Sequence, residues 1–219
     1  MPRTPRALVV VPNHPHHVVL RGNNRRRLFS YPTDYRFFLL RLCQASRRQG
    51  VAVHTAVQMT NHLHLIVTPP THEQLSKCVG SAAQSYAQFR NRRRCSSGKL
   101  FEERFKSIPI RTEERMAITT AYVELNPVRA GVSRSAGDYR WSTFRRHAGL
   151  ESIEPLVERL WTPSSWFLSL GASPTRRSAA FVDCFEHYRA RDEWADVYAD
   201  PSLPDEVGRV ERPDRSRAG

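Results

Sequence analysis

The segment from residue 51 to residue 69 constrains the fold most, because two apolar runs of strand length flank a two-residue turn. The first run is "VAVHTAVQM" (51–59), the turn is "TN", and the returning run is "HLHLIVTP" (62–69). This pattern predicts a β-hairpin. A helix is expected before it, over 31–50, where an apolar side ends at a glycine. Another is expected after it, from residue 71 to about 93, with acidic residues early and basic residues late.

The remaining motifs complete a regular order of elements. "HHVVLRGN" (16–23) and "FKSIPI" (105–110) each predict a strand, and residues 112–127 predict a helix that Pro127 ends. The resulting order β-α-β-β-α-β-α is the split βαβ pattern. It predicts an α+β fold, with a ferredoxin-like antiparallel sheet and helices on one face.

A change of composition near residue 150 predicts two parts in the chain. We expect residues 1–148 to form the main domain and residues 149–219 to form an acidic, mostly helical or irregular extension. A helix is predicted over 179–199, and the last twenty residues have the composition of a disordered segment.

The distribution of charge points to a polyanionic partner. Residues 1–150 hold 25 basic and 8 acidic side chains, a net charge of +17, whereas residues 151–219 have a net charge of −4. Of the 34 basic residues only three are lysines, and arginine forks suit phosphate. A solvated, arginine-rich surface is the alternative, but a general bias of composition would have affected both parts. The charge therefore predicts a nucleic-acid-binding domain, and the acidic extension is a candidate mimic of DNA on its basic face.

Three arginine-rich runs are the candidate phosphate contacts: "RGNNRRR" (21–27), "RNRRR" (90–94) and "ERFKS" (103–107). Each run alone has a solvated face as its alternative. With a basic residue of the helix over 112–127 added, the predicted DNA-binding side chains are Arg21, Arg25, Arg26, Arg27, Arg92, Arg93, Arg94, Arg104, Lys106 and Arg115.

Targeting and redox signals predict a cytoplasmic protein. No apolar run approaches the roughly 20 residues of a membrane span, and the basic N-terminal stretch lacks the features of a signal peptide. The four cysteines are scattered without a CxxC pair, which disfavours a disulfide framework and a thiolate zinc site.

His62 and His64 in "NHLHL" lie two residues apart on a predicted strand, so their side chains point to the same face. Two neutral imidazoles at this spacing can chelate one divalent cation. The alternative is a pair of solvated surface histidines, and the motif alone does not decide between them. A polar stripe on the helix over 112–127 adds a second feature, because Tyr122 and Asn126 lie one turn apart on it. Spacing alone leaves Tyr122 open as a chemical group or as an amphipathic residue at a domain edge.

Five motifs occurring in order carry a resemblance to a known family. They are "PNHPHHVVLRGNNRRRLF", "QMTNHLHLIV", "GKLFEERFKS", "YVELNPVRAGV" and "DYRWSTF", within residues 8–148. Together they resemble the REP-associated tyrosine transposases, which are related to the IS200/IS605-type single-tyrosine transposases of the HUH endonuclease superfamily. Two positions depart from the usual text of the family: Thr60 stands where a proline is common, and Glu103 stands where a glycine is common.

The resemblance implies a metal-dependent enzyme that cuts and rejoins single-stranded DNA through a 5′-phosphotyrosine. By position in the motifs, Tyr122 would be the nucleophile, and His62, His64 and Asn126 would bind Mg²⁺ or Mn²⁺. Residues 1–148 would form the catalytic domain. The DNA would be a hairpin or palindromic repeat with single-stranded flanks, and the protein would act at the bacterial nucleoid as a monomer or homodimer.

Two other functions compete with this interpretation. A non-catalytic, RRM-like module would also combine a ferredoxin-like sheet with a basic face, but it needs aromatic residues where this chain has His62 and His64. A hydrolytic phosphodiesterase would activate water at the metal and would not need Tyr122. Tyr86 is the competing tyrosine, expected to pack or to support DNA binding. We expect structural roles for His14, His16 and His17, and no catalytic role for His54, His72, His147 and His187.

Overall fold

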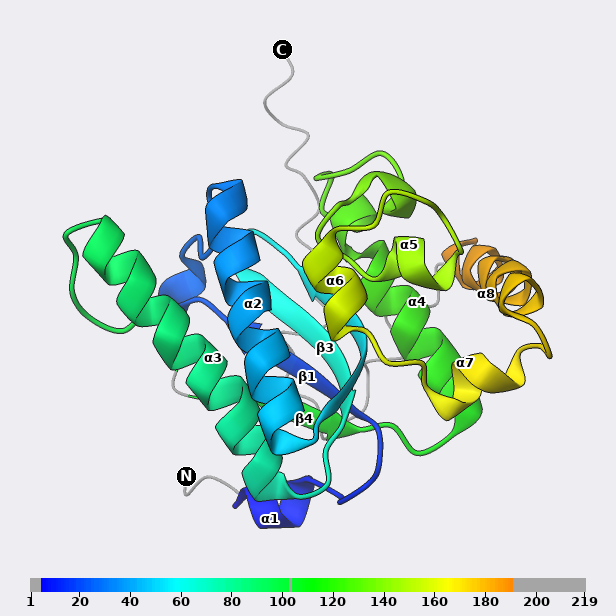
Figure 1. Ribbon diagram of the computed structural model, residues 1–219, viewed down its shortest axis with the longest axis horizontal. Coiled ribbons are helices and arrows are strands. Elements are labelled where there is room, and N and C mark those ends of the chain that lie inside the picture. Colours follow the sequence, from blue (N-terminus) through cyan, green and yellow to red (C-terminus); the bar gives the residue numbers. More distant parts are fainter. Residues whose placement is uncertain (1–4, 103, 191–219) are drawn as a thin grey trace.

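Four strands form one antiparallel sheet with the order β2-β3-β1-β4 (Figure 1). The computed structural model describes residues 5–102 and 104–190. The strands are β1 (His16–Arg21), β2 (Ala52–Gln58), β3 (His62–Thr68) and β4 (Lys106–Pro109). β3, the second strand of the hairpin, pairs with β2 and β1, and β1 also pairs with β4. β3 and β1 are therefore the two central strands of the sheet. This is the order of the split βαβ fold, and the predicted ferredoxin-like α+β architecture is confirmed.

Helices cover both faces of the sheet, and not one face as expected. α2 (Pro32–Gln49) and α3 (His72–Arg93) pack together on one face, with Leu63 and Leu65 in their hydrophobic core. α4 (Glu113–Arg129) contacts β2 and β3 and shares a second core with Ile66. Because successive side chains of a strand alternate between faces, β3 presents apolar residues to both sides, and each side needs a cover. The position of α4 places its side chains against the face that carries His64.

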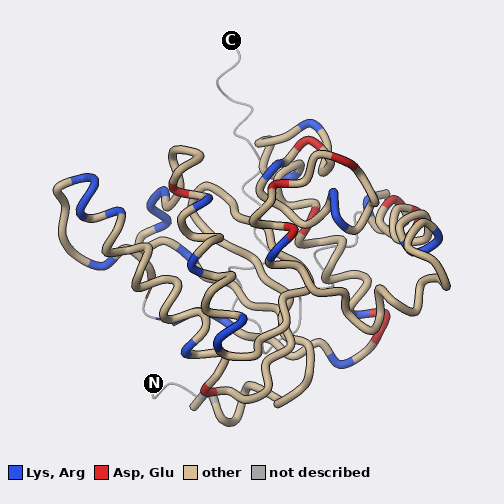
Figure 2. Tube along the Cα trace, viewed as in Figure 1, with Lys and Arg blue, Asp and Glu red and all other residues tan. Residues whose placement is uncertain are grey.

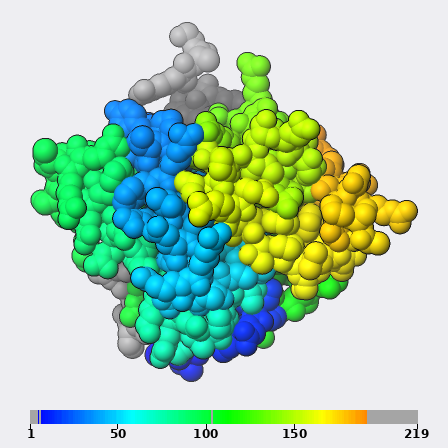
Figure 3. Space-filling view, viewed as in Figure 1, coloured from blue at the N-terminus to red at the C-terminus, as the bar shows by residue number. Residues whose placement is uncertain are grey.

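The extension beyond residue 148 is mostly helical where the structure describes it, with short irregular segments between its helices. In Figure 3 its residues, coloured yellow to orange, form the right-hand side of the molecule beside α2. The expected helix over 179–199 starts earlier, and its residues after 190 lie outside the described ranges, as do the last twenty residues. The remaining helices are α1 (Arg6–Val9), η1 (Asn23–Arg25), η2 (Ala136–Asp138), α5 (Phe144–His147), α6 (Pro155–Leu160), α7 (Ser165–Ser169) and α8 (Pro174–Arg189).

The ends of α2 follow from its sequence. Pro32 occupies the first turn, where its missing N–H costs nothing, and Asp34 accepts the backbone N–H groups of Ser30 and Tyr31. Gly50 ends the helix in the left-handed conformation, with φ of 64°. The predicted boundaries of this helix are therefore confirmed to within a residue or two.

α4 begins as predicted but ends later. The Thr112 side chain accepts the backbone N–H of Arg115 at 3.1 Å, which caps the helix. Pro127 was expected to end it, yet the helix continues to Arg129 with Pro127 inside its last turn. A proline this close to the end removes only one helical hydrogen bond, and its carbonyl accepts the N–H of Val132 at 2.9 Å. Asn126 is therefore a helical residue with a fixed direction relative to Tyr122.

A buried polar network fixes α4 to the chain that follows it. The Glu124 carboxylate is fully buried, and its Oε1 accepts hydrogen bonds from Thr143 Oγ1 at 2.8 Å and His147 Nδ1 at 2.9 Å. The Trp161 indole N–H donates to His147 Nε2 at 3.1 Å. The His147 ring is therefore part of a buried structural network. Glu124 is two residues from Tyr122, so this network also positions the tyrosine.

Candidate active site

His62 and His64 project from β3 toward α4, as the strand periodicity predicts. His62 is partly buried and His64 is 3% exposed. Their rings are edge to face, with centroids 4.8 Å apart. Nδ1 of His62 lies 2.6 Å from Oδ1 of Asn61, and Nδ1 of His64 lies 2.9 Å from Nε2 of His17. Since a partner holds Nδ1 of each ring, Nε2 is the nitrogen that each has left for a ligand. The alternative of two solvated surface histidines does not describe this pair.

His17 belongs to the same cluster, a placement that the sequence did not predict. Its ring is 1% exposed and stacks on His64, with centroids 5.1 Å apart. The register of the sheet explains the contact. His64 pairs with Val19, so His17 is its diagonal neighbour on the same face of the sheet. His16 points the other way and bonds to the backbone N–H of Val11 at 3.0 Å, so its expected structural role is confirmed.

Tyr122 faces this cluster from α4. Its ring centroid is 6.0 Å from that of His64 and 6.3 Å from that of His17, with both pairs edge to face. One turn later, the Asn126 amide nitrogen donates to the Tyr122 carbonyl at 2.9 Å, which leaves the amide oxygen for another partner. The Asn126 side chain also lies close enough to His62 to raise the pKa of its ring. The structure thus brings together all four residues proposed for catalysis and metal binding, within one chain.

Two arginines act on the tyrosine electrostatically. Burial raises the pKa of Tyr122, while the charges of Arg129 and Arg21 lower it. The Arg129 guanidinium carbon lies 5.9 Å from the centroid of the Tyr122 ring. Arg21 pairs directly with His62 across β1 and β3, so both side chains emerge on the same face. Both cations favour the phenolate, the form of a tyrosine that can act as a nucleophile.

The histidines of the cluster stay neutral over a wide range of pH. Burial lowers the pKa of His62 to about 4 and that of His17 to about 3. Burial, together with the charge on His62, lowers the pKa of His64 well below its ordinary value. A neutral imidazole is the form that coordinates a metal. The site therefore supplies ligand nitrogens that do not require deprotonation at neutral pH.

The side chains present fit a divalent ion. Among the described residues, no group of three or more His, Cys, Asp or Glu side chains is placed to hold a metal. A third ligand must then be of another type, and the Asn126 amide oxygen beside His62 is of that type. Two imidazole nitrogens and one amide oxygen suit Mn²⁺, and they leave positions for the oxygens of a phosphate. His62, His64 and Asn126 would hold the ion.

Two of the predicted DNA contacts lie on the face that carries the histidines. Lys106 pairs with Val19 on β1, which itself pairs with His64 on β3, so these three residues form a row across the sheet. Arg21 lies beside His62 at the end of the same face. Arg115 lies about two helical turns, or roughly 10 Å along α4, before Tyr122. Their roles in binding DNA stay predictions.

The other predicted contacts gather at one end of the molecule. Figure 2 shows lysines and arginines concentrated at the C-terminal end of α3 and in the neighbouring loop. Exposed arginines of the loop after β1 and of the end of α3 come together here: Arg25, Arg26, Arg27, Arg92, Arg93 and Arg94. The structure thus brings two of the three arginine-rich runs into one basic region.

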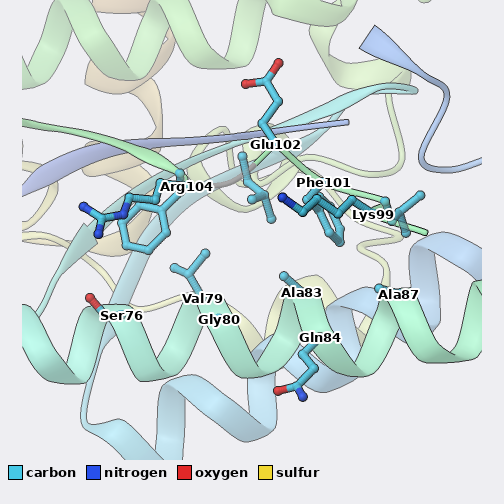
Figure 4. Close-up of a pocket in the computed structure, with 13 residues that line it drawn as sticks. Ser76, Val79, Gly80, Ala83, Gln84, Ala87, Lys99, Phe101, Glu102 and Arg104 are labelled. Atoms are coloured by element: carbon cyan, nitrogen blue, oxygen red, sulfur yellow. The ribbon is translucent and has the colours of Figure 1, made fainter. Parts of the chain in front are cut away.

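Arg104 lies elsewhere, at a groove of about 670 Å³ between α3 and a segment that includes residues 99–102, 104 and 105 (Figure 4). Val79 and Ala83 point from α3 into the space, toward Phe101, whereas Glu102 points away. Leu20 also lines this groove, so it is on the face of the sheet opposite to the histidines. The predicted contact of Arg104 with DNA is therefore separated from the candidate active site by the sheet.

Tyr86 has a structural position, which confirms that it packs. Its ring is fully buried among Phe29 and Phe38, and its hydroxyl donates to the Leu28 carbonyl at 2.6 Å. The expectation for His54 is also consistent, since its ring bonds to the Thr162 carbonyl and to Thr68 Oγ1, each at 2.9 Å. Tyr122 remains the only one of the two candidate tyrosines that faces the histidines.

Comparison with known proteins identifies the family of the chain. A family model described as "Transposase IS200 like" matches residues 10–126, which include His62, His64, Tyr122 and Asn126. The chain belongs to this family of IS200-like transposases. None of the curated proteins compared with it matches significantly.

One solved structure shares the fold of this IS200-like transposase. A REP-associated tyrosine transposase, solved bound to a REP hairpin, superposes with a TM-score of 0.56 at 18% identity, over 75% of this chain and 93% of that one. A candidate transposase from Deinococcus radiodurans R1 gives a TM-score of 0.39 at 15% identity, over 52% of this chain and 92% of its own. The family model confirms membership among the IS200-like transposases, and the first of these two structures confirms that the fold is that of a REP-associated tyrosine transposase. In the described ranges, no helix is both long and apolar enough to cross a bilayer.

Proposed function

We propose that this IS200-like transposase cuts and rejoins single-stranded DNA at hairpin repeats, with Tyr122 as its nucleophile. The observation that carries the proposal is the edge-to-face contact of Tyr122 with His64, at 6.0 Å between centroids, in a site that also holds His62 and Asn126. Family membership supports a transposase that acts on DNA. The REP hairpin in the similar solved structure supports a folded DNA strand as the ligand.

The metal would be Mg²⁺ or Mn²⁺, bound by His62, His64 and Asn126. When bound, it supplies Lewis acidity, neutralising a non-bridging oxygen of the scissile phosphate. His17 and Asn61 would hold the two imidazole rings in the orientation that directs Nε2 to the ion. Asn126 is itself oriented by its hydrogen bond to the Tyr122 carbonyl, so ligand and nucleophile are positioned by the same helical turn.

Tyr122 would perform the covalent step. Its phenol loses a proton to water, aided by the charges of Arg129 and Arg21, and the oxygen attacks phosphorus. The bond from phosphorus to O3′ breaks as the bond to Tyr122 forms, leaving a 5′-phosphotyrosine. The released O3′ takes a proton from water. Because the phosphodiester energy is kept in the phosphotyrosine, a 3′-hydroxyl of another strand can reverse the step and join new partners without ATP.

The geometry favours action in cis. Tyr122 contacts His17 and His64 of its own chain, and the network from Glu124 to Trp161 holds its helix in that position. We infer that one chain provides a complete site, so that a monomer can cut. The protein would act at the bacterial nucleoid, where such DNA is found.

The RRM-like alternative receives little support from the sheet. Binding of RNA in that mode needs an exposed sheet face with aromatic residues to stack the bases. Here β3 has α2 and α3 on one face and α4 on the other, and the central position of its histidine face is His64, which is 3% exposed. A basic domain of this kind would bind nucleic acid through its edges and ends instead.

Metal-dependent cleavage and rejoining tests the proposal. Hairpin DNA with single-stranded flanks, taken from repeats near the gene, is incubated with Mn²⁺ and wild type, Tyr122→Phe or His64→Ala. The proposal predicts cutting and strand joining by the wild type alone. Cutting by Tyr122→Phe would support the hydrolytic phosphodiesterase instead. Binding without cutting by all three proteins would support a DNA-binding module.

A further inference from the structure

A cavity of about 630 Å³ at the C-terminal end of α3 gathers four arginines around one carboxylate. Arg90, Arg93 and Arg94 come from α3, and Arg27 comes from the loop after β1. Asp34 is the acidic residue in the lining. The sequence places these groups in two separate basic runs, so only the fold reveals that they share one cavity.

The single carboxylate is already occupied. Asp34 Oδ2 accepts the backbone N–H groups of Ser30 and Tyr31, at 3.0 and 3.1 Å, and its Oδ1 lies 3.4 Å from Arg93 Nη1. In the ranges that the structure describes, neither Arg27 nor any of the remaining α3 arginines of the cavity forms an ion pair. Three guanidinium groups therefore meet here without a counter-charge from the protein, which makes the cavity attractive to an anion.

Arg90 is the buried member of this set. It is 5% exposed, and its Nη2 donates to the Arg27 carbonyl at 2.7 Å. Its Nε is buried and has no hydrogen-bond partner among the described residues. Burial and the neighbouring charge of Arg94 lower the pKa of Arg90, so an anion in the cavity would relieve both effects. Arg90, which lines the cavity, thus has a buried donor that lacks an acceptor among the described residues.

An aromatic ring completes the rim. Tyr31 lines the cavity and is 58% exposed. The Arg93 guanidinium carbon lies 6.0 Å from the centroid of its ring. Exposed aromatic rings next to guanidinium groups are platforms on which nucleic-acid bases stack. The N-terminus of α2, with its partial positive charge, begins at the next residue.

The cavity lies at the same end of the sheet as the candidate active site. Backbone N–H groups of Leu28 and Phe29 both donate to the Thr60 carbonyl, at 2.7 and 3.0 Å. Asn61, the partner of His62, reaches the Arg25 carbonyl with its amide nitrogen at 3.4 Å. The loop between β1 and α2 therefore runs directly from the metal-binding histidines to the arginine cavity. A DNA strand that follows its exposed arginines reaches both.

We propose that this cavity binds one nucleotide of the single strand that flanks the hairpin. Arg27, Arg90 and Arg94 hold the phosphate, and the adjoining base stacks on the exposed ring of Tyr31. The inference rests on the proposed function in its choice of DNA as the ligand. The cavity would be a second DNA-binding site, away from the scissile phosphate, and it would distinguish hairpins that have an unpaired flank from those that do not.

Binding measured in EDTA tests this without any cleavage. Fluorescence anisotropy compares a hairpin carrying single-stranded flanks with the same hairpin made blunt. Tyr31→Ala is expected to weaken binding of the flanked hairpin roughly ten-fold and to leave the blunt hairpin unchanged, while Tyr31→Phe behaves as wild type. Arg94→Ala is expected to reduce the salt dependence of flanked binding by about one phosphate contact. Arg48→Ala, which removes an exposed arginine at the C-terminal end of α2, away from the cavity and outside the predicted DNA contacts, is the matched control.

A photo-crosslink identifies the contact directly. With 5-iododeoxyuridine placed in the flank, the proposal predicts crosslinking to Tyr31, and no crosslink from the same base placed in the hairpin loop. The proposal is overturned if Tyr31→Ala and Arg94→Ala bind flanked DNA like wild type, or if they weaken flanked and blunt hairpins equally. It is also overturned if inorganic phosphate alone occupies the cavity at micromolar concentration, which would make it a small-anion site. These outcomes are separate from the role of Tyr122, because the proposed nuclease activity is tested by cleavage alone.

Discussion

Nε2 of His17 lies 2.9 Å from Nδ1 of His64, and the two rings stack with an angle of 16° between their planes. The pair links β1 to β3 in the buried centre of the sheet. If His64 uses Nε2 for a metal, its Nδ1 carries the proton and donates it to His17. His17 is then a positioning residue, which fixes both the tautomer and the direction of the ligand.

Replacing His17 with alanine is expected to weaken binding of Mn²⁺ by about 10- to 100-fold, because the His64 ring loses its orienting partner. Electron paramagnetic resonance can measure the affinity with no DNA present. His54→Ala is the matched control. It also removes a buried histidine of a strand, but His54 bonds to Thr162 and Thr68 and not to His62 or His64. Equal affinities for the two variants would contradict a positioning role.

Arg129→Gln is expected to move the pH profile of cleavage. The charge of Arg129 lowers the pKa of Tyr122, so its removal raises that pKa and moves the rising limb of the rate to higher pH. If the pKa of the phenol rises by about one, the phenolate fraction at fixed pH falls about ten-fold. Cleavage rates between pH 6 and pH 9 provide the measurement. Arg129→Lys should keep most of the effect, and Arg115→Gln should leave the profile in place. An unchanged profile in Arg129→Gln would show that the cation does not act on the phenol.

Low pH is expected to destabilise the metal-free protein. Burial lowers the pKa of His16 and of His62 to about 4, and that of His17 to about 3. Below about pH 6.5 these histidines are protonated in the unfolded chain but stay neutral in the folded chain. The free energy of unfolding therefore decreases as the pH is lowered, until the pH reaches the pKa values of the folded state. Each histidine contributes up to about 1.4 kcal/mol per pH unit. Guanidinium unfolding in EDTA at pH 7, 6 and 5 measures this. His17→Gln should give a shallower slope, and equal stability at pH 7 and pH 5 would contradict the burial of these rings.

Glu124→Ala is expected to lower the free energy of unfolding by about 3 kcal/mol, because Thr143 and His147 then lose their buried acceptor. Cleavage should fall as well, since the helix that carries Tyr122 loses its anchor to the following segment. Urea unfolding and cleavage rates are measured on the same preparations. Glu124→Gln keeps an oxygen at this position and should lose less than half as much stability. A stable but inactive Glu124→Ala variant would instead assign Glu124 a direct role in the reaction.

Local sequence signals predicted the elements of the fold well. The hairpin, the capped helices and the split βαβ order all depend on neighbouring residues, such as Thr112 and Gly50, whose preferences the tertiary structure does not override. Pro127 shows the limit of such signals. A proline disrupts a helix because it lacks a backbone N–H and its ring clashes with the preceding turn. Here Pro127 lies in the last turn, and the helix ends two residues later, at Arg129. The cover on both faces of the sheet was missed because the sequence pattern does not show that Leu65 and Ile66 belong to two different cores.

The candidate site was predictable in part for the same reason. His62 and His64 are linked by strand periodicity, and Tyr122 and Asn126 by one helical turn. His17 was missed as a site residue because its place depends on long-range pairing, and Arg129 was missed because the helix was expected to end at Pro127. The diagonal contact of His17 with His64 requires the register of β1 against β3, which no local signal in this sequence specifies. The arginine cavity likewise joins residues 27 and 90, which only the packing of the loop on α3 brings together.

The central claim is that Tyr122 forms a covalent bond with DNA, and mass spectrometry of the trapped complex tests it most directly. Wild-type protein is incubated with Mn²⁺ and hairpin DNA, denatured, and digested with nuclease and trypsin. Trypsin releases residues 116–129 as one peptide, in which Tyr122 is the only tyrosine. The account predicts a nucleotide attached through its 5′-phosphate to Tyr122, and no such adduct with Tyr122→Phe or His64→Ala. An adduct on another residue, or cleaved DNA with no adduct at all, would contradict it.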